Sequence, residues 1–441
     1  MNFSFFVFFI SCSDIELNST TTVELLQSEI DTHRIYPIHI PSDIDGYNTP
    51  DQILGEAYER NFRALPTHGQ LAEEPWSDTY WPKNKGGISH RWRTDEAHDY
   101  PLHSKEELFE RGVEITEFLS PAEKYDLLVG NYDWSLTHRT LAEGNPMEAS
   151  WTGYCHGWSP ASLAYDEPHP VVMENPDGLR IPFGSSDIKA LLTYFRAEVV
   201  RSDYPEHDWR AETRTLGTMC SSEKALDPGC YDSNPAAFHL VMANQLGIRG
   251  EGFNIDADIS KQKWNQPVFA YSSRVLYEKE PASYASIGTV KQYVVESHVS
   301  WGLEIEPSYL PVIGTDHQIT KEEVYHYTID VNSEGDIIGG QWLTKSQDNG
   351  FISLNIAWEI LSQRDENGDG EPDYDDTEVS NIIWQYFSFP DYVWTQENAD
   401  FPRQYKQLSG MYALISTTKS SRQELFDYFG ALEELYEKSL E

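Results

Sequence analysis

The feature that most constrains the fold of this chain is a change in hydrophobic periodicity near Gly252. Upstream, apolar residues recur at the spacing of amphipathic helices. Downstream, Phe253 to Ile259 alternates apolar and polar residues, as strands do. Ranges 293–301, 324–331 and 337–343 continue this pattern, and the last two form a predicted hairpin across Gly335. Because helix and strand signals are segregated along the chain, we predict an α+β fold.

Helix-start signals place the predicted helices. A polar cap precedes a helical pattern or a proline at four upstream positions, which are Ser104, Ser120, Ser159 and Asn234. We expect the first helix to bury Leu108, Phe109, Val113 and Phe118. Ser421 is the predicted cap of a final amphipathic helix.

The composition excludes several classes of protein. With 39% hydrophobic and 13% aromatic residues, the chain is too apolar to be disordered. Its 72 acidic and 32 basic residues give a net charge of −40, which repels nucleic acid and anionic membranes. Such a field attracts lysine-rich partners and divalent cations, and its simplest role is to keep the protein soluble.

The N-terminal residues resemble a bacterial export signal. An apolar run from Phe3 to Ile10 is followed by Ser11-Cys12, which resembles a lipobox. In this interpretation Cys12 is lipidated and residues 13–45 are a tether. The protein is then exported, either as a lipoprotein of the cell surface or outer membrane or in secreted form. The alternative is an apolar N-terminal segment of a cytoplasmic protein, because no basic residue precedes the run.

The 4 cysteines divide by context. Cys220 and Cys230 flank a turn-rich segment, and in an exported protein they are a predicted disulfide. Cys155 is left alone, which makes it a candidate nucleophile. The alternative is a buried structural thiol that behaves as a small hydrophobe.

Cys155 lies in the sequence Gly153-Tyr154-Cys155-His156-Gly157-Trp158. Small residues on both sides let the backbone turn and let a substrate approach. Amides at the start of the following helix would lower the thiol pKa and donate to an oxyanion. The Cys155 amide is therefore the expected first oxyanion donor, and Trp158 could wall an acyl channel.

A thiolate nucleophile needs a base and a group that orients it. Of the 14 histidines, His239 is the preferred base, early on the helix that Asn234 caps, and His298 is the alternative. Asp256 and Asp258 share one face of the following strand, and either could orient the imidazole of His239.

Residues 365–376 match the ligand spacing of an EF-hand-type calcium loop, with Gly370 at the tight turn. The predicted Ca²⁺ ligands are Asp365, Asn367, Asp369, Glu371, Asp373 and Asp376. The last position is Asp instead of the usual Glu. We expect a structural ion, and the alternative is an acidic surface turn.

Segments between about residues 76 and 342 resemble the secreted transglutaminases of oomycetes that carry an elicitor peptide. Trp264-Asn265-Gln266-Pro267-Val268, followed by Tyr277-Glu278, is similar to that peptide. The segment around Cys155 is similar to the active-site stretch of the family. The resemblance implies a calcium-dependent enzyme with a papain-like core, in which Cys155 is the nucleophile, His239 the base and Asp256 the orienting group. It also implies substrate-binding roles for Trp158, Trp264 and Asn265. Residues 269–274 depart from the peptide.

The function implied by the resemblance is transfer of a protein glutamine's acyl group to a lysine, through a thioester on Cys155. The residues leave open a papain-like cysteine protease, because water and amine compete for one thioester, and a non-catalytic calcium-stabilised surface lipoprotein. Expected partners are proteins with accessible glutamine and lysine. The expected organisation is a signal (1–12), a tether (13–45), an aromatic N-terminal region (46–103), a papain-like catalytic core (104–290) and a strand-rich C-terminal region (291–441).

Overall fold

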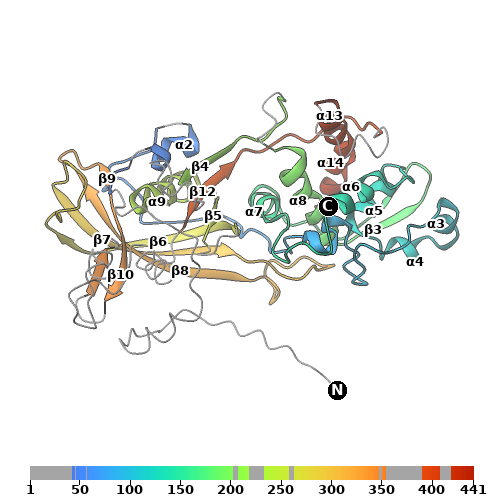
Figure 1. Cartoon of the computed structure of the whole chain (residues 1–441), viewed down its shortest axis with the longest axis horizontal. Coiled ribbons are helices and arrows are strands. Elements are labelled where there is room, and N and C mark those ends of the chain that lie inside the picture. Colours follow the sequence, from blue (N-terminus) through green and yellow to red (C-terminus); the bar gives the residue numbers. More distant parts are fainter. Residues whose placement is uncertain are drawn as a thin grey trace, which may run out of the picture.

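The computed structural model describes residues 42–44, 46–55, 57–201, 207–217, 233–257, 263–346, 350–353, 390–407 and 419–441. These residues form an α+β structure with a sheet half and a helical half (Figure 1). None of the described helices is both long enough and apolar enough to span a membrane.

The helices are α2 (Asp51–Leu54), α3 (Lys105–Arg111), α4 (Val113–Thr116), α5 (Pro121–Leu128), α6 (Ser135–Glu143), α7 (Cys155–Ala164), α8 (Ser185–Tyr194), α9 (Pro235–Met242), α13 (Lys419–Tyr428) and α14 (Leu432–Ser439). Two π-helical segments, Phe195–Val199 and Ala243–Arg249, extend α8 and α9. The strands are β1 (His68–Gln70), β2 (Val171–Glu174), β3 (Arg180–Phe183), β4 (Thr213–Gly217), β5 (Phe253–Asp256), β6 (Asn265–Lys279), β7 (Lys291–Gly302), β8 (Thr320–Val331), β9 (Ile337–Gly339), β10 (Trp342–Ser346), β11 (Gly350–Ser353) and β12 (Tyr392–Gln396).

The sheet half is built on one antiparallel sheet in the order β11-β10-β8-β7-β6-β5-β12-β4, with β1 added to β6 and β9 added to β8. The long strands β6, β7 and β8 pair along most of their length. The predicted ranges 293–301 and 324–331 lie within β7 and β8, and β8 and β9 form the expected hairpin. The range 337–343 is divided between β9 and β10, and in the described residues β5 ends at Asp256. At its start β6 pairs with β5, which in turn pairs with β12.

Helix α9 covers one face of this sheet (Figure 1). The ring of Phe238 packs against Phe253 of β5, Tyr325 of β8 and Trp342 of β10. Phe253 and Ile255 lie in this apolar core. Because side chains alternate along a strand, Asn254 and Asp256 face the opposite side of the sheet.

The helical half has its own apolar core, in which residues between Trp76 and Ala211 pack against the C-terminal helices. The ring of Phe429 stacks on those of Tyr125 and Tyr194. The chain therefore ends in the half that contains α5 to α8 (Figure 1). We expected a catalytic core at 104–290 and a separate region at 291–441, but the two apolar cores do not follow this division. Helix α9, β5 and β6 belong to the sheet half, because apolar faces pack by complementarity and not by chain order.

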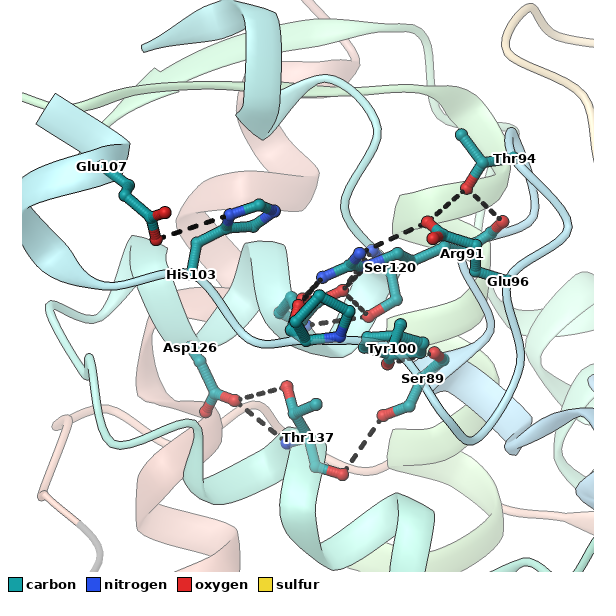
Figure 2. A network of polar contacts seen from close by, with 12 residues as sticks. Ser89, Arg91, Thr94, Glu96, Tyr100, His103, Glu107, Ser120, Asp126 and Thr137 are labelled. Carbon is teal, nitrogen blue, oxygen red and sulfur yellow. Dashed lines mark hydrogen bonds and ion pairs between the residues drawn. The ribbon is translucent and has the colours of Figure 1, made fainter. Parts of the chain in front are cut away.

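A buried polar network fixes the segment before α3 against the helical half (Figure 2). The Arg91 guanidinium donates to Glu123 of α5 at 2.9 and 2.7 Å and to Glu96 at 3.3 Å. Ser89 Oγ donates to the carbonyl of Thr137, whose hydroxyl donates to Asp126 at 2.8 Å. These bonds satisfy charges that would otherwise be costly to bury. They thereby hold the segment before α3, which follows the residues beside the candidate site, against the helical half.

Three helix predictions are confirmed and three need correction. The capping boxes at Ser104 and Ser120 and the cap at Asn234 are present. Of the residues expected to be buried by the first helix, only Leu108 is; Phe109, Val113 and Phe118 are 44%, 37% and 40% exposed. Ser159-Pro160 does not start a helix, because α7 already begins at Cys155. Ser421 lies inside α13, which begins at Lys419.

Candidate active site

Cys155 is the first residue of α7, and this helix lies between the sheet half and the rest of the helical half (Figure 1). On one side α7 packs against α8 and the following π-helix, and on the other side against β5 and β6. Gly157 makes the first contact possible, since a Cβ there would collide with the carbonyl oxygen of Thr193. Ser159 Oγ anchors the second contact by donating to Asn254 Oδ1 of β5 at 2.6 Å.

The backbone before Cys155 is fixed by Tyr80. The Tyr154 N–H donates to the Tyr80 carbonyl at 2.6 Å, and the Tyr80 hydroxyl donates to the carbonyl of Ser150 at 2.7 Å. A Cβ on Gly153 would lie 2.5 Å from the Tyr80 ring, so glycine is required by this approach. The Tyr80 ring also meets the edge of Trp264, with centroids 5.4 Å apart. Tyr80 and Trp264 thus form an aromatic pair beside the thiol.

The Cys155 thiol is buried, with 8% of the residue exposed. Its Sγ donates to the Lys263 carbonyl at 3.4 Å, and the Asn265 side-chain amide donates to Sγ at 3.4 Å. Burial raises the pKa of the thiol, and although the hydrogen bonds from Asn265 lower it, the net pKa is above the ordinary value. The negative charges of Glu304 and Asp256 act in the same direction as burial. The expectation of a thiol pKa lowered by the helix N-terminus is therefore wrong for this arrangement.

The wall facing Cys155 is the sheet face opposite α9. Asp256 of β5 is paired with Asn265 of β6 and with Tyr392 of β12, so these three side chains share that face. Asn265 Oδ1 accepts hydrogen bonds from Trp394 Nε1 at 2.8 Å and from the Tyr392 hydroxyl at 3.3 Å. Asp256 Oδ1 accepts the Trp264 N–H at 3.1 Å. Asp256 therefore lies at the site, and this hydrogen bond orients the Trp264–Asn265 segment.

A second carboxylate, Glu304, comes from the long connection between β7 and β8. Gln266 Nε2 donates to both of its carboxylate oxygens at 3.2 Å. Burial raises the pKa of Glu304, against the lowering effect of Gln266. The connection is tied to the helical half, where the Ile305 N–H donates to the carbonyl of Asp78 at 3.0 Å.

His239 does not lie at the thiol, which corrects the predicted base. Its Nδ1 is 2.8 Å from the Tyr327 hydroxyl, and its ring lies 6.1 Å from that of Phe62. Both contacts are on the face covered by α9, and Cys155 faces the other side of the sheet. Desolvation lowers the pKa of His239 to about 4, so its imidazole is neutral. The helix-plus-strand pattern placed His239 on a helix, but it did not indicate the face of the sheet on which α9 packs.

The remaining predicted residues fall into two groups. His298 is hydrogen-bonded to Glu296 and Glu322 on the sheet surface. Trp158 is fully buried in the helical core, where it cannot form the wall of an open channel. Cys12, Asp258, Cys220, Cys230 and the loop 365–376 lie outside the described residues, so their roles stay predictions. Within the ranges that the structure describes, no three His, Cys, Asp or Glu side chains form a metal-binding group, and Cys155 is the free cysteine.

Four residues of the site were not predicted from the sequence. Gln266 lies within the peptide-like motif, but no role could be inferred for it, while Glu304, Tyr392 and Trp394 carried no signal at all. They reach the site through strand pairing and a long connection, which no local pattern encodes. Asn265 was expected to bind substrate, and the structure places its amide against the nucleophile itself.

The chain is similar to known proteins in sequence and in fold. The family model described as transglutaminase elicitor matches residues 138–358, which include Cys155 and Asn265. The fold is similar to the crystal structure of the GP42 transglutaminase from Phytophthora sojae, with a TM-score of 0.52 and 18% sequence identity over 88% of this chain and 99% of that one. No curated protein matches the sequence.

Proposed function

Since this chain belongs to the transglutaminase elicitor family, we propose that it is a protein-glutamine γ-glutamyltransferase with Cys155 as its nucleophile. The observation that carries this proposal is the position of the Cys155 thiol. It lies at the start of a helix, 3.4 Å from a side-chain amide donor, where the two halves of the molecule meet. A helix start offers backbone N–H groups to developing negative charge, and the amide adds another donor.

The proposed reaction has two displacements at one carbonyl carbon. The Cys155 thiolate attacks the γ-carboxamide of a protein glutamine, and the C–N bond breaks to release ammonia and leave a thioester. A neutral lysine amine then attacks the thioester, the C–S bond breaks and an isopeptide bond forms. The thiol proton must reach the leaving nitrogen in the first step, and the amine proton must return to sulfur in the second.

We assign the proton transfers to Glu304. The negative charges of Glu304 and Asp256 both act on Cys155. A carboxyl whose pKa is raised by burial holds a proton more readily, so it can accept the thiol proton and pass it to the leaving nitrogen, which departs as ammonia. Asp256 keeps a positioning role through Trp264. The papain-like arrangement implied by the family resemblance would then apply to the nucleophile but not to His239.

The acidic surroundings of the thiol fit a cationic acceptor. Glu304 and Glu306 both act electrostatically on Tyr80, one member of the aromatic pair beside Cys155. A lysine side chain entering past Tyr80 and Trp264 would meet negative charge before it loses its proton. This supports transfer to an amine over transfer to water, as in the papain-like protease alternative.

The test is incorporation of a labelled primary amine into a glutamine-containing protein, with calcium present and absent. We expect incorporation by the wild type and none by Cys155→Ala. Glu304→Gln should lose about a hundredfold or more in kcat, within the usual range for a general acid–base group. Asp316→Asn, an exposed carboxylate on the same connection, is the matched control and should stay close to wild type. Peptide cleavage without amine incorporation would instead identify a cysteine protease.

One observation favours a second candidate, a non-catalytic calcium-stabilised surface protein. The thiol is buried and its pKa is raised, as expected of a structural cysteine. Mass spectrometry after incubation with a glutamine peptide separates the two, because only the enzyme forms a thioester on Cys155. Export, lipidation of Cys12 and calcium binding by residues 365–376 are part of the proposal. Lipidation is tested by membrane fractionation of Cys12→Ser.

A further inference from the structure

The side chain of Asn265 has a defined orientation. It is 3% exposed, and its Oδ1 accepts two hydrogen bonds, one from the Trp394 indole and one from the Tyr392 hydroxyl. An indole N–H can only donate, so the amide oxygen must face Trp394. The amide nitrogen therefore faces Cys155 Sγ, and the reversed orientation would oppose two N–H groups.

The donors that orient Asn265 belong to β12, outside the family-model match at residues 138–358. Strand β12 is held in the sheet by pairing with β5 on one side and β4 on the other. Trp394 pairs with Asn254, the residue that anchors α7 through Ser159. One strand late in the chain thus positions both the nucleophile's helix and the amide that contacts the nucleophile.

We propose that the side-chain amide of Asn265 is an oxyanion donor for the acyl transfer, beside the Cys155 backbone N–H, and that Trp394 is the residue that positions it. This inference rests on the proposed function of Cys155. The substrate carbon is bonded to Sγ in each tetrahedral intermediate, so its oxygen lies within reach of a donor that already contacts Sγ. The Cys155 N–H lies in the first helical turn, which leaves N–H groups without an intrahelical acceptor.

A neutral donor fits the electrostatics of this site. The Asp256 carboxylate acts on Cys155 and would oppose negative charge on the oxyanion, whereas Glu304 holds the thiol proton at that stage. A fixed amide dipole stabilises the developing oxyanion without reorganisation. The hydrogen bond from Trp394 also polarises the Asn265 amide, which strengthens its N–H groups as donors.

The perturbations are Asn265→Ala, Asn265→Asp and Trp394→Phe. Loss of one oxyanion donor lowers kcat by roughly 10²- to 10³-fold, so we expect that loss for Asn265→Ala with KM within a few-fold of wild type. Asn265→Asp has the same volume and brings a charge that repels the oxyanion, so its kcat should be no higher. Trp394→Phe removes one neutral hydrogen bond and should cost about three- to tenfold.

The decisive readout is the inhibition constant of a glutamine-peptide analogue with an aldehyde in place of the carboxamide. The aldehyde adds to the Cys155 thiol and presents an oxygen at the oxyanion position. Across the variants, its affinity should fall in proportion to kcat/KM, as for a transition-state analogue. Trp342→Phe, which removes an indole hydrogen bond of 2.9 Å to the Ser233 carbonyl on the far face of the sheet, is the control and should leave both quantities unchanged.

Four results would overturn the inference. A higher KM with unchanged kcat would make Asn265 a substrate-binding residue. A fall in the rate of Cys155 alkylation that matches the fall in kcat would mean that the amide stabilises the thiolate and not the oxyanion. If the wild type is active and Asn265→Ala is equally active, this inference is refuted but the proposed function is not. An inactive wild type that forms no thioester would refute the proposed function and this inference with it. Unfolding midpoints show whether a variant is misfolded. If Asn265→Ala is misfolded, Asn265→Asp takes its place in the comparison.

Discussion

The placement of His239 gives a prediction that separates a structural histidine from a catalytic one. His239 is 4% exposed, and burial lowers its pKa from an ordinary 6.5 to about 4. Above pH 6.5 the imidazole is neutral in the folded and the unfolded chain. As the pH falls from 6.5 towards 4, only the unfolded chain gains the proton, so folding stability is lost.

The magnitude comes from this difference in pKa. One pKa unit corresponds to about 1.4 kcal/mol, so His239 should cost about 2 kcal/mol of unfolding free energy at pH 5 and about 3 kcal/mol below pH 4. His239→Gln removes this titration, and its amide can still meet the Tyr327 hydroxyl. The assay is urea unfolding at pH 7 and pH 5. Between these values, wild type should lose about 2 kcal/mol more than His239→Gln.

His298→Gln is the control of opposite sign. The Glu322 carboxylate raises the pKa of His298, so its contribution to stability is present below the unfolded pKa and is lost as the pH rises. The effect should be small, because 38% of this side chain is exposed and water screens the pair. His239→Gln should also keep its amine-incorporation activity within a few-fold. The reasoning fails if this variant folds but is inactive, or if its pH dependence of stability equals that of wild type.

Three further predictions concern the thiol, its helix and the calcium loop. The rate of Cys155 alkylation by iodoacetamide should be low at pH 6 and should rise steeply towards alkaline pH, because burial raises the thiol pKa; fast alkylation at pH 6 would contradict the buried geometry. Gly157→Ala should lower the free energy of unfolding by about 1–3 kcal/mol, measured by urea unfolding, because its methyl group meets the Thr193 carbonyl. Calcium should raise the melting temperature of wild type but not of Asp365→Ala/Asp369→Ala, and an equal response in both would exclude the loop as the binding site.

Much of the local structure was determined by the sequence alone. Ser104 and Ser120 specify their helices because a cap and a glutamate three residues later satisfy the first free N–H groups without help from the rest of the chain. The alternation from Phe253 onward separates Asp256 from Phe253 and Ile255 on opposite faces of the strand, because the side-chain period of a strand is fixed by its backbone. The Cys155 segment identified the candidate nucleophile, and its resemblance to a family is confirmed.

The tertiary structure decided which of these groups meet. Periodicity shows that α9 has an apolar face, but not that it packs on the sheet face opposite α7, which separates His239 from Cys155. It likewise gives no reason for Trp394 to orient Asn265, since β12 reaches β5 from a distant part of the chain. The burial of Cys155 also depends on the tertiary structure. A helix start by itself would lower the pKa of the thiol, but burial between the two halves raises it. Contacts between distant segments depend on the packing of whole surfaces, and local sequence patterns do not encode them.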